Sequence, residues 1–194
     1  MELQQPSLTV EWHRQTDVVV VGYGGAGASV AITAHDAGAG VLILEKAPEG
    51  QEGGNTRVAG QGYLTPSSVD KAIAYFNALC GAYTVPEEMV RVWAEEMCRN
   101  NDWLKSLNGD PVEHHLQPEG IEFPELPGAD CAHKYHHGPV LGYEGTWKLF
   151  KSAVEQRRIE VLYATPGKEL IQNRATGEIV GVRTEREGNP FNIK

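Results

Sequence analysis

The stretch DVVVVGYGGAG, residues 17–27, decides the fold. It begins with a run of β-branched residues, Val18–Val21, which lacks the alternation of a half-exposed strand and so predicts a strand buried on both faces. After a glycine-rich turn, residues 25–38 are mostly small and suit a helix that packs closely on this strand. Residues 41–44, VLIL, then predict a second buried strand. A strand, a helix and a strand in about 30 residues form a βαβ unit, so we expect an α/β fold with a parallel sheet.

The turn itself, GYGGAG at residues 22–27, satisfies the pattern GxGxxG. Gly22 permits a tight turn, Gly24 lets the backbone approach a pyrophosphate, and Gly27 allows close packing of helix on strand. The helix N-terminus also offers N–H groups and its positive dipole end to phosphates. Glycine is common and the pattern alone is weak, but its place between a strand and a helix predicts a dinucleotide site in a Rossmann-like domain.

An acidic residue, Glu45, ends the second strand. A carboxylate in this position accepts hydrogen bonds from the ribose hydroxyls of a bound dinucleotide. It would also repel a 2′-phosphate, which disfavours NADP. These features leave both NAD and FAD open.

The segment after the second strand distinguishes FAD from NAD. EKA at residues 45–47, followed by GGNTRVAGQG at residues 53–62, resembles the FAD-dependent family of fumarate reductase and succinate dehydrogenase flavoproteins, which includes the 3-ketosteroid dehydrogenases. Residues 159–166 resemble the third Rossmann strand of that family, and residues 169–182 its β-meander. The resemblance covers most of residues 16–185 and implies an FAD cofactor. It also implies that residues 45–62 wrap the pyrophosphate and reach the isoalloxazine ring, and that Pro166 and Gly167 meet the adenine.

The glycine pattern and the resemblance together assign one set of residues to cofactor binding. They are Gly22, Gly24, Gly25, Ala26, Gly27, Glu45, Lys46, Ala47, Gly53, Gly54, Asn55, Thr56, Ala59, Gly60, Gln61, Gly62, Pro166 and Gly167. Thr56 stands where covalent members of the family carry the histidine that links the flavin. Threonine has no ring nitrogen, so we expect the FAD to be held non-covalently.

The resemblance implies an oxidoreductase that acts on CH–CH or C=C bonds next to a carbonyl or carboxylate, with a small-molecule substrate of dicarboxylate or steroid type. No residue matches the proton-handling or substrate-binding groups of the family, so no catalytic residue is assigned. Two alternatives stay open, an NAD-dependent dehydrogenase and a non-catalytic nucleotide-binding fragment. We expect the 194 residues to lack the C-terminal part of the family fold, to be inactive alone, and to self-associate through the incomplete fold.

The remaining pattern predicts an N-terminal arm over residues 1–15 and an incomplete FAD-binding domain over residues 16–194, with a helical and loop insertion at about residues 69–145. Residues 48–68, rich in Gly, Pro, Ser, Thr and Asn, predict mostly loop. Residues 111–145 show no periodicity. Periodicity and turn residues predict helices at 69–79, 87–107 and 147–157, and strands at 159–164, 169–172 and 179–185.

Composition narrows the classes of partner. A net charge of −9 without a basic patch argues against nucleic acid and anionic membranes. No apolar run is long enough for a signal peptide or a membrane span, so we expect a cytoplasmic protein. The three cysteines lack CxxC spacing and predict reduced thiols.

A group of metal-ligating residue types, Cys131, His133, His136 and His137, matches no standard zinc spacing, and His114 and His115 lie too far away in sequence to complete one. We therefore predict no metal site and expect these histidines to line a polar loop or contact a neighbouring domain, with no assigned role.

Overall fold

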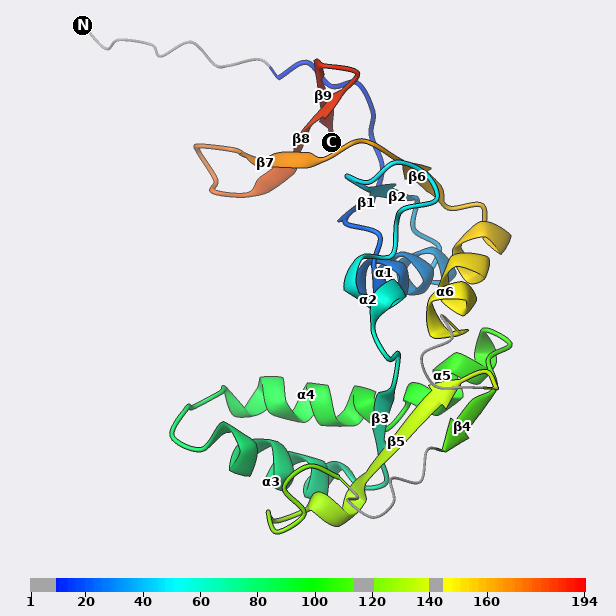
Figure 1. The fold of residues 1–194 in the computed structure, drawn as a ribbon. Coiled ribbons are helices and arrows are strands. Elements are labelled where there is room, and N and C mark those ends of the chain that lie inside the picture. The colour runs from blue at the N-terminus through cyan, green and yellow to red at the C-terminus, as the bar shows by residue number, and fades with distance from the viewer. Residues whose placement is uncertain (1–9, 114–120, 140–144) are drawn as a thin grey trace, which may run out of the picture. The chain divides into compact units, whose positions relative to one another are not determined.

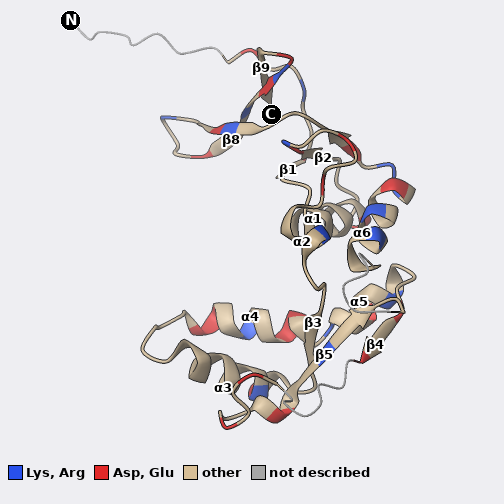
Figure 2. Cartoon of the chain, in the orientation of Figure 1, with Lys and Arg blue, Asp and Glu red and all other residues tan. Residues whose placement is uncertain are grey.

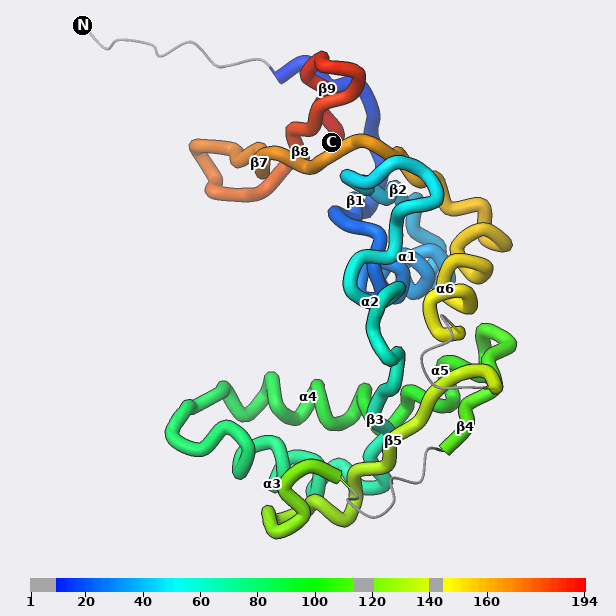
Figure 3. The backbone as a smooth tube through the Cα atoms, in the orientation of Figure 1, coloured from blue at the N-terminus to red at the C-terminus, as the bar shows by residue number. Residues whose placement is uncertain are grey.

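The computed structural model describes residues 10–113, 121–139 and 145–194 and divides the chain into two compact units. Unit 1 comprises residues 1–55 and 151–194, and unit 2 comprises residues 56–150. The chain leaves unit 1 within helix α2 (Gly54–Val58) and returns to it within helix α6 (Gly145–Gln156), as can be followed in Figure 3. Among the described residues, no helix is both long and apolar enough to cross a lipid bilayer.

Unit 1 is built on a parallel sheet with the strand order β1-β2-β6, which confirms the predicted α/β class (Figure 1). The strands are β1 (Val18–Val21), β2 (Val41–Leu44) and β6 (Glu160–Leu162). Val18 pairs with Val41, and Leu44 pairs with both Val21 and Leu162. Helix α1 (Gly25–Asp36) joins β1 to β2 and completes the predicted βαβ unit.

Helix α1 packs closely against the sheet because small residues, two alanines and Gly27, lie on its buried side. Ala28, Ala31 and Ile32 are fully buried. A Cβ atom on Gly27 would lie 2.0 Å from the carbonyl oxygen of Gly22, so only glycine fits between the helix and the preceding turn. Gly22 itself has a φ of +99°, a left-handed conformation that favours glycine.

The second sheet of unit 1 is antiparallel, with the order β7-β8-β9. Its strands are β7 (Gly167–Gln172), β8 (Ile179–Arg186) and β9 (Asn189–Ile193). The first two lie where the pattern predicts them, whereas β9, with the sequence NPFNI, was missed because proline and asparagine disfavour strands. Within the predicted arm, the N–H of His13 donates to the carbonyl of Asn192 over 2.9 Å, and Arg14 forms a parallel bridge with Ile193.

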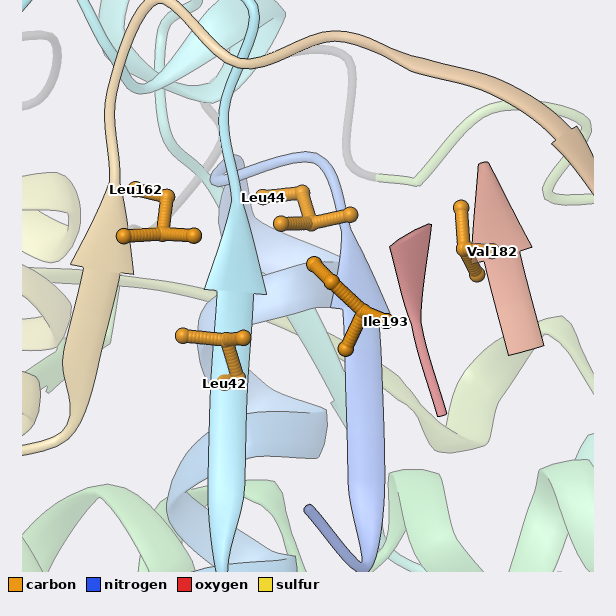
Figure 4. Close-up of a cluster of buried hydrophobic side chains, with 5 residues drawn as sticks. All are labelled: Leu42, Leu44, Leu162, Val182 and Ile193. Atoms are coloured by element: carbon orange, nitrogen blue, oxygen red, sulfur yellow. The ribbon is translucent and has the colours of Figure 1, made fainter. Parts of the chain in front are cut away.

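One apolar cluster joins the two sheets of unit 1. Leu42 and Leu44 from β2 and Leu162 from β6 pack with Val182 of β8 and Ile193 of β9 (Figure 4). All five side chains are less than 10% exposed. The antiparallel sheet is therefore part of the core of unit 1.

Besides the parts of α2 and α6 that it includes, the described residues of unit 2 form three helices and a small antiparallel sheet. The helices are α3 (Val69–Cys80), α4 (Glu87–Met97) and α5 (Asn100–Ser106), and a 3-10 turn, η1, covers Ala129–Cys131. The strands are β3 (Tyr63–Pro66), β5 (Ala132–His137) and β4 (Pro111–Glu113), in the order β3-β5-β4. Ala72, Ala94 and the buried thiol of Cys131 form the centre of its core.

One local prediction for this region is corrected by the structure. The single helix predicted over residues 87–107 is two helices, because Asn100 and Asn101 after the break bind strand β3. The Asn100 side chain donates to the carbonyl of Leu64 over 2.8 Å. The Asn101 side chain accepts a hydrogen bond from the Tyr63 hydroxyl over 3.1 Å. Residues 48–68 contain α2 and β3 as well as loop, and residues 111–145 contain β4 and β5, since strand pairing between distant segments supplies the order that local sequence does not show.

His133, His136 and His137 of the Cys/His pattern lie on strand β5, so the expectation that they line a polar loop is wrong, and contact with a neighbouring domain stays a prediction. His133 pairs with Glu113 over 3.0 Å, and Nδ1 of His137 accepts from the N–H of Asp110 over 2.8 Å. His136 is buried. No group of three His, Cys, Asp or Glu side chains able to hold a metal occurs in the part of the chain that the structure describes, and His114 and His115 lie outside that part.

The close contact at Gly27 leads to a test of stability. We expect Gly27→Ala to lower the free energy of unfolding by about 1–3 kcal/mol, because the added methyl group must displace α1 from the Gly22 turn. Urea unfolding without FAD, followed by circular dichroism, measures this. Gly60→Ala is the matched control, since a Cβ there meets nothing within 4 Å, and it should change stability by less than about 0.5 kcal/mol. Equal effects of the two substitutions would contradict the packing argument.

Candidate functional site

A cavity of about 270 Å³ lies in unit 1, where the strands of the parallel sheet end. The carboxyl ends of parallel strands meet at one edge of a sheet, which is where open α/β sheets bind ligands. The lining combines residues from the ends of β1 and β2, the loops that follow them, and the segment after β6. These residues are Val21, Gly22, Tyr23, Gly24, Leu44, Glu45, Lys46, Gly54, Pro166 and Gly167.

The glycine loop brings the N-terminus of α1 to this cavity. The N–H of Gly22 donates to the carbonyl of Leu44 over 2.7 Å, which turns the chain sharply at the end of β1. Helix α1 then begins at Gly25 with Gly24 as its N-cap, and its first turn contains neither a capping side chain nor an acidic residue. The helix cannot satisfy its own first N–H groups, so the helix end favours an anion.

A second glycine segment approaches the first. Gly53 forms a parallel bridge with Gly24, and its N–H donates to the carbonyl of Tyr23 over 2.8 Å. A Cβ atom on Gly24 would lie 3.4 Å from the carbonyl oxygen of Gly53. Gly53 and Gly54 both have positive φ, of 109° and 50°. Two stretches of bare backbone therefore meet beside the helix end, where no side chain intervenes.

Glu45 is buried at the end of β2 and holds the glycine loop. Its Oε2 accepts from the N–H of Tyr23 and its Oε1 from the N–H of Ala47, both over 2.7 Å. Each carboxylate oxygen can accept more than one hydrogen bond. The same side chain can therefore shape the loop and also accept hydrogen bonds from ribose hydroxyls.

The segment after β6 closes the cavity on the other side. The N–H of Thr165 donates to the carbonyl of Glu45 over 2.8 Å, and the Thr165 side chain is fully buried. This contact fixes Pro166 and Gly167 opposite the loop that follows β2. A Cβ atom on Gly167 would lie 2.9 Å from Cγ1 of Val21, so a side chain at this position would clash with Val21.

Two tyrosines lie close together at the glycine loop, with the rings of Tyr23 and Tyr163 centred 6.5 Å apart. Burial, followed by the proximity of Tyr163, raises the pKa of Tyr23 well above its ordinary value. Burial, followed by the nearby Glu52 carboxylate, raises the pKa of Tyr163 to about 12. Both phenols therefore stay neutral at physiological pH and add no negative charge beside the cavity.

Seven of the predicted cofactor residues line the cavity directly, namely Gly22, Gly24, Glu45, Lys46, Gly54, Pro166 and Gly167. Gly25, Ala26 and Gly27 form the first turn of α1, while Ala47 and Gly53 hydrogen-bond to residues of the cavity wall. Asn55 is the last residue of the first of the two chain segments that form unit 1.

The predicted residues Thr56, Ala59, Gly60, Gln61 and Gly62 belong to unit 2. The Gln61 side chain accepts from the N–H of Trp147 over 2.9 Å at the start of α6.

Sequence reasoning missed three lining residues: Val21, Leu44 and Tyr23. Val21 and Leu44 are the last residues of their strands, and this position at the carboxyl end of the sheet could have predicted that they line the site. Tyr23 occupies a variable position of GxGxxG, which carries no signal of its own.

These features fit the ADP half of a dinucleotide. The meeting of Gly24 and Gly53 at a helix N-terminus suits a pyrophosphate, and Glu45 suits a ribose. The apolar wall made by Val21, Leu44 and Pro166 suits an adenine ring.

Comparison with known proteins agrees with this geometry. A family model described as an FAD binding domain matches residues 17–194. A fumarate reductase (cytochrome) of Shewanella frigidimarina is 30% identical over 182 residues, which cover 88% of this chain and 30% of the relative. A digoxin reductase of Eggerthella lenta is 46% identical over 194 residues, covering 90% of this chain and 33% of the relative. The chain thus spans about a third of the length of these relatives.

Solved structures show the same fold. A 3-ketosteroid-Δ4-(5α)-dehydrogenase from Rhodococcus jostii RHA1 superposes with a TM-score of 0.79 and 22% identity, over 96% of this chain and 45% of that one. A flavocytochrome c3 fumarate reductase superposes with a TM-score of 0.76 and 21% identity, over 94% of this chain and 32% of that one. The chain therefore belongs to the family of FAD-binding domains that this family model describes, and its cofactor is FAD.

Proposed function

We propose that this chain forms the ADP-binding part of a flavin-dependent oxidoreductase that acts on a CH–CH or C=C bond next to a carbonyl or carboxylate. The observation that carries the proposal is the bridge between Gly24 and Gly53. It brings the GGNT segment against the phosphate-binding turn. An NAD site needs only the glycine loop and the acidic residue, so this second segment favours FAD.

Each predicted residue has a role in this proposal. The pyrophosphate lies on the first turn of α1, against Gly24, Gly25, Ala26 and Gly27. Glu45 accepts hydrogen bonds from the adenosine ribose, and Lys46 and Ala47 continue that wall. Pro166 and Gly167 contact the adenine. Gly22 shapes the turn, and Gly53–Gly62 lead from the pyrophosphate toward the isoalloxazine ring.

The chemistry that bound FAD supplies is hydride transfer at its isoalloxazine ring. The residues of this chain bind and orient the cofactor. The helix N-terminus would bind the phosphates through backbone N–H groups, and the buried Glu45, which also holds the glycine loop, would accept hydrogen bonds from the ribose. We assign none of these residues to proton transfer.

The substrate class follows from the relatives. Their names refer to the reduction of fumarate, of urocanate and of digoxin, and to the dehydrogenation of a 3-oxo steroid. Within this proposal the substrate is a small dicarboxylate or a steroid-like molecule. Figure 2 shows Lys and Arg residues interspersed with Asp and Glu along α4 and α6, an arrangement that does not favour nucleic acid.

Replacing Gly24 tests the proposed cofactor and its site together. We expect Gly24→Val to raise the dissociation constant for FAD at least tenfold, about 1.4 kcal/mol, because the side chain would occupy the space between Gly24 and Gly53 that the pyrophosphate approaches. Titration of FAD into the protein, followed by quenching of flavin fluorescence, measures the affinity, with NAD⁺ as a parallel ligand. Unchanged FAD affinity in a folded Gly24→Val variant, or tighter binding of NAD⁺ than of FAD by the unmodified chain, would contradict the assignment.

The mode of attachment has its own test. Thr56 lacks a nucleophilic ring nitrogen, so the flavin should separate completely from the protein when the FAD complex is precipitated with acid. The absorption spectra of the supernatant and of the redissolved pellet measure the distribution. Flavin colour that stays with the pellet after denaturation would show a covalent bond.

We also propose that the 194-residue chain does not turn over substrate by itself, since it spans about a third of the length of its relatives and the resemblance assigns no catalytic residue to it. Exposed apolar side chains on the antiparallel sheet, Leu170 and Ile179, would favour its self-association. Steady-state assays of fumarate reduction and 3-ketosteroid desaturation with added FAD should show no repeated turnover. Repeated turnover by a preparation whose mass ends at Lys194 would refute this.

A further inference from the structure

A buried threonine on β8 contacts the segment that closes the cavity. Thr184 is only 1% exposed, and its hydroxyl donates to the carbonyl of Pro166 over 2.7 Å. It also pairs with Gly167 in the register of β7 and β8. A hydroxyl that is buried this deeply needs a hydrogen-bond partner. Here the partner is a residue of the cavity wall.

The wall formed by Pro166 and Gly167 depends on this hydroxyl. Proline has no N–H, so the carbonyl of Pro166 is the only backbone group of this residue that a hydrogen bond can hold. Strand β7 begins only at Gly167, and its register with β8 shifts between Gly167 and Glu169. The strand pairing is therefore irregular right beside the wall. The Thr184 hydroxyl supplies the hydrogen bond that ties Pro166 to β8.

The same wall lies between the two sheets of unit 1. A Cβ atom on Gly167 would lie 2.9 Å from Cγ1 of Val21 on β1 and 3.7 Å from Cγ1 of Val182 on β8. The N–H of Thr165 ties the start of the wall to the end of β2. The hydroxyl of Thr184 ties it to the antiparallel sheet. A displacement of the wall would therefore change the space that the cavity offers to a ligand.

We propose that Thr184 is a positioning residue for the adenine of the cofactor. Its hydroxyl keeps Pro166 and Gly167 in place before the base binds, so that binding does not have to order them. A wall that occupies its binding position only part of the time lowers the apparent affinity by that fraction. Thr184 does not line the cavity and acts through the wall. This role rests on the proposed placement of the adenine against Pro166 and Gly167.

Substitutions that remove or keep the hydroxyl isolate this role. Thr184→Val replaces the hydroxyl by a methyl group of similar size, whereas Thr184→Ser keeps the hydroxyl. Thr16→Val is the matched control, because the Thr16 hydroxyl also donates to a backbone carbonyl over 2.7 Å, that of Gly40. Thr16 precedes β1, so it lies at the opposite end of the parallel strands from the cavity.

Thr184→Val should raise the dissociation constant for FAD about fivefold, because the loss of one neutral hydrogen bond would leave the wall in place only about a fifth of the time. Thr184→Ser should regain most of that loss. Thr16→Val should bind FAD as the unmodified chain does. Quenching of flavin fluorescence measures the dissociation constants, and the melting temperature without ligand shows whether each variant is folded.

The choice of ligand separates positioning of the adenine from a general loss of structure. In the proposed site the base meets the wall, whereas the pyrophosphate lies on the two glycine segments. Thr184→Val should therefore lower the preference for ADP over inorganic pyrophosphate about fivefold, as measured by the shift of the Gly24 amide resonance during titration. Equal weakening of ADP and pyrophosphate would reduce Thr184 to a structural role. Unchanged FAD affinity, or a Thr184→Ser variant as weak as Thr184→Val, would also overturn the inference.

A measurement on the unmodified chain covers the case in which Thr184→Val does not fold. ADP should shift the methyl resonance of Thr184 more than that of Thr16, because the base contacts the wall that Thr184 holds. Inorganic pyrophosphate should shift neither methyl resonance. A Thr184 methyl that stays unshifted in saturating ADP would overturn its role while leaving the proposed FAD site intact. An unmodified chain that binds neither FAD nor ADP would overturn both.

Discussion

The close approach of bare backbone at the end of β1 is the constraint on which the rest of unit 1 depends. Gly27 must lack a side chain for α1 to lie against the Gly22 turn, and the backbone of Gly53 approaches that of Gly24 closely enough to form a bridge. The apolar cluster that joins the two sheets packs β2 and β6 against β8 and β9. The three strand ends can then supply one site from separate segments of the chain.

Polar side chains around the site act on the loop as well as on the ligand. The Glu45 carboxylate accepts hydrogen bonds from two backbone N–H groups of the loops around the site. The same carboxylate would also accept hydrogen bonds from a ribose. Glu52 accepts a hydrogen bond from the N–H of Gly50 in its own loop and also pairs with Lys151 of α6. Backbone groups that buried carboxylates hold in place form a preorganised surface for a cofactor.

The sequence was informative where structure is local. Strand β1, helix α1 and strand β2 follow from a continuous run of residues whose periodicity and glycines agree, and Glu45 follows from its position after β2. Strands β5 and β9 could not be found in this way, because HKYHH and NPFNI have weak strand propensity and are ordered by partners far away in sequence. The helix break before Asn100 has the same cause, a contact with β3. At the site, the resemblance to the flavoprotein family predicted Pro166 and Gly167, which line the cavity. Tyr23 in the cavity wall and the pairing of Glu52 with Lys151 could be found only from three-dimensional contacts.

The most direct test of the central claim compares the amide resonances of the isotopically labelled chain during titration with ADP and with adenosine. The account places the pyrophosphate at the junction of the two glycine segments, so ADP should shift the amides of Gly24, Ala26, Gly27 and Gly53. Adenosine, which lacks phosphates, should shift mainly the amide of Gly167 and leave those of the junction nearly unchanged. If ADP and adenosine produced the same shifts, or if ADP shifted only residues of unit 2, the phosphate site would not lie where the two glycine segments meet.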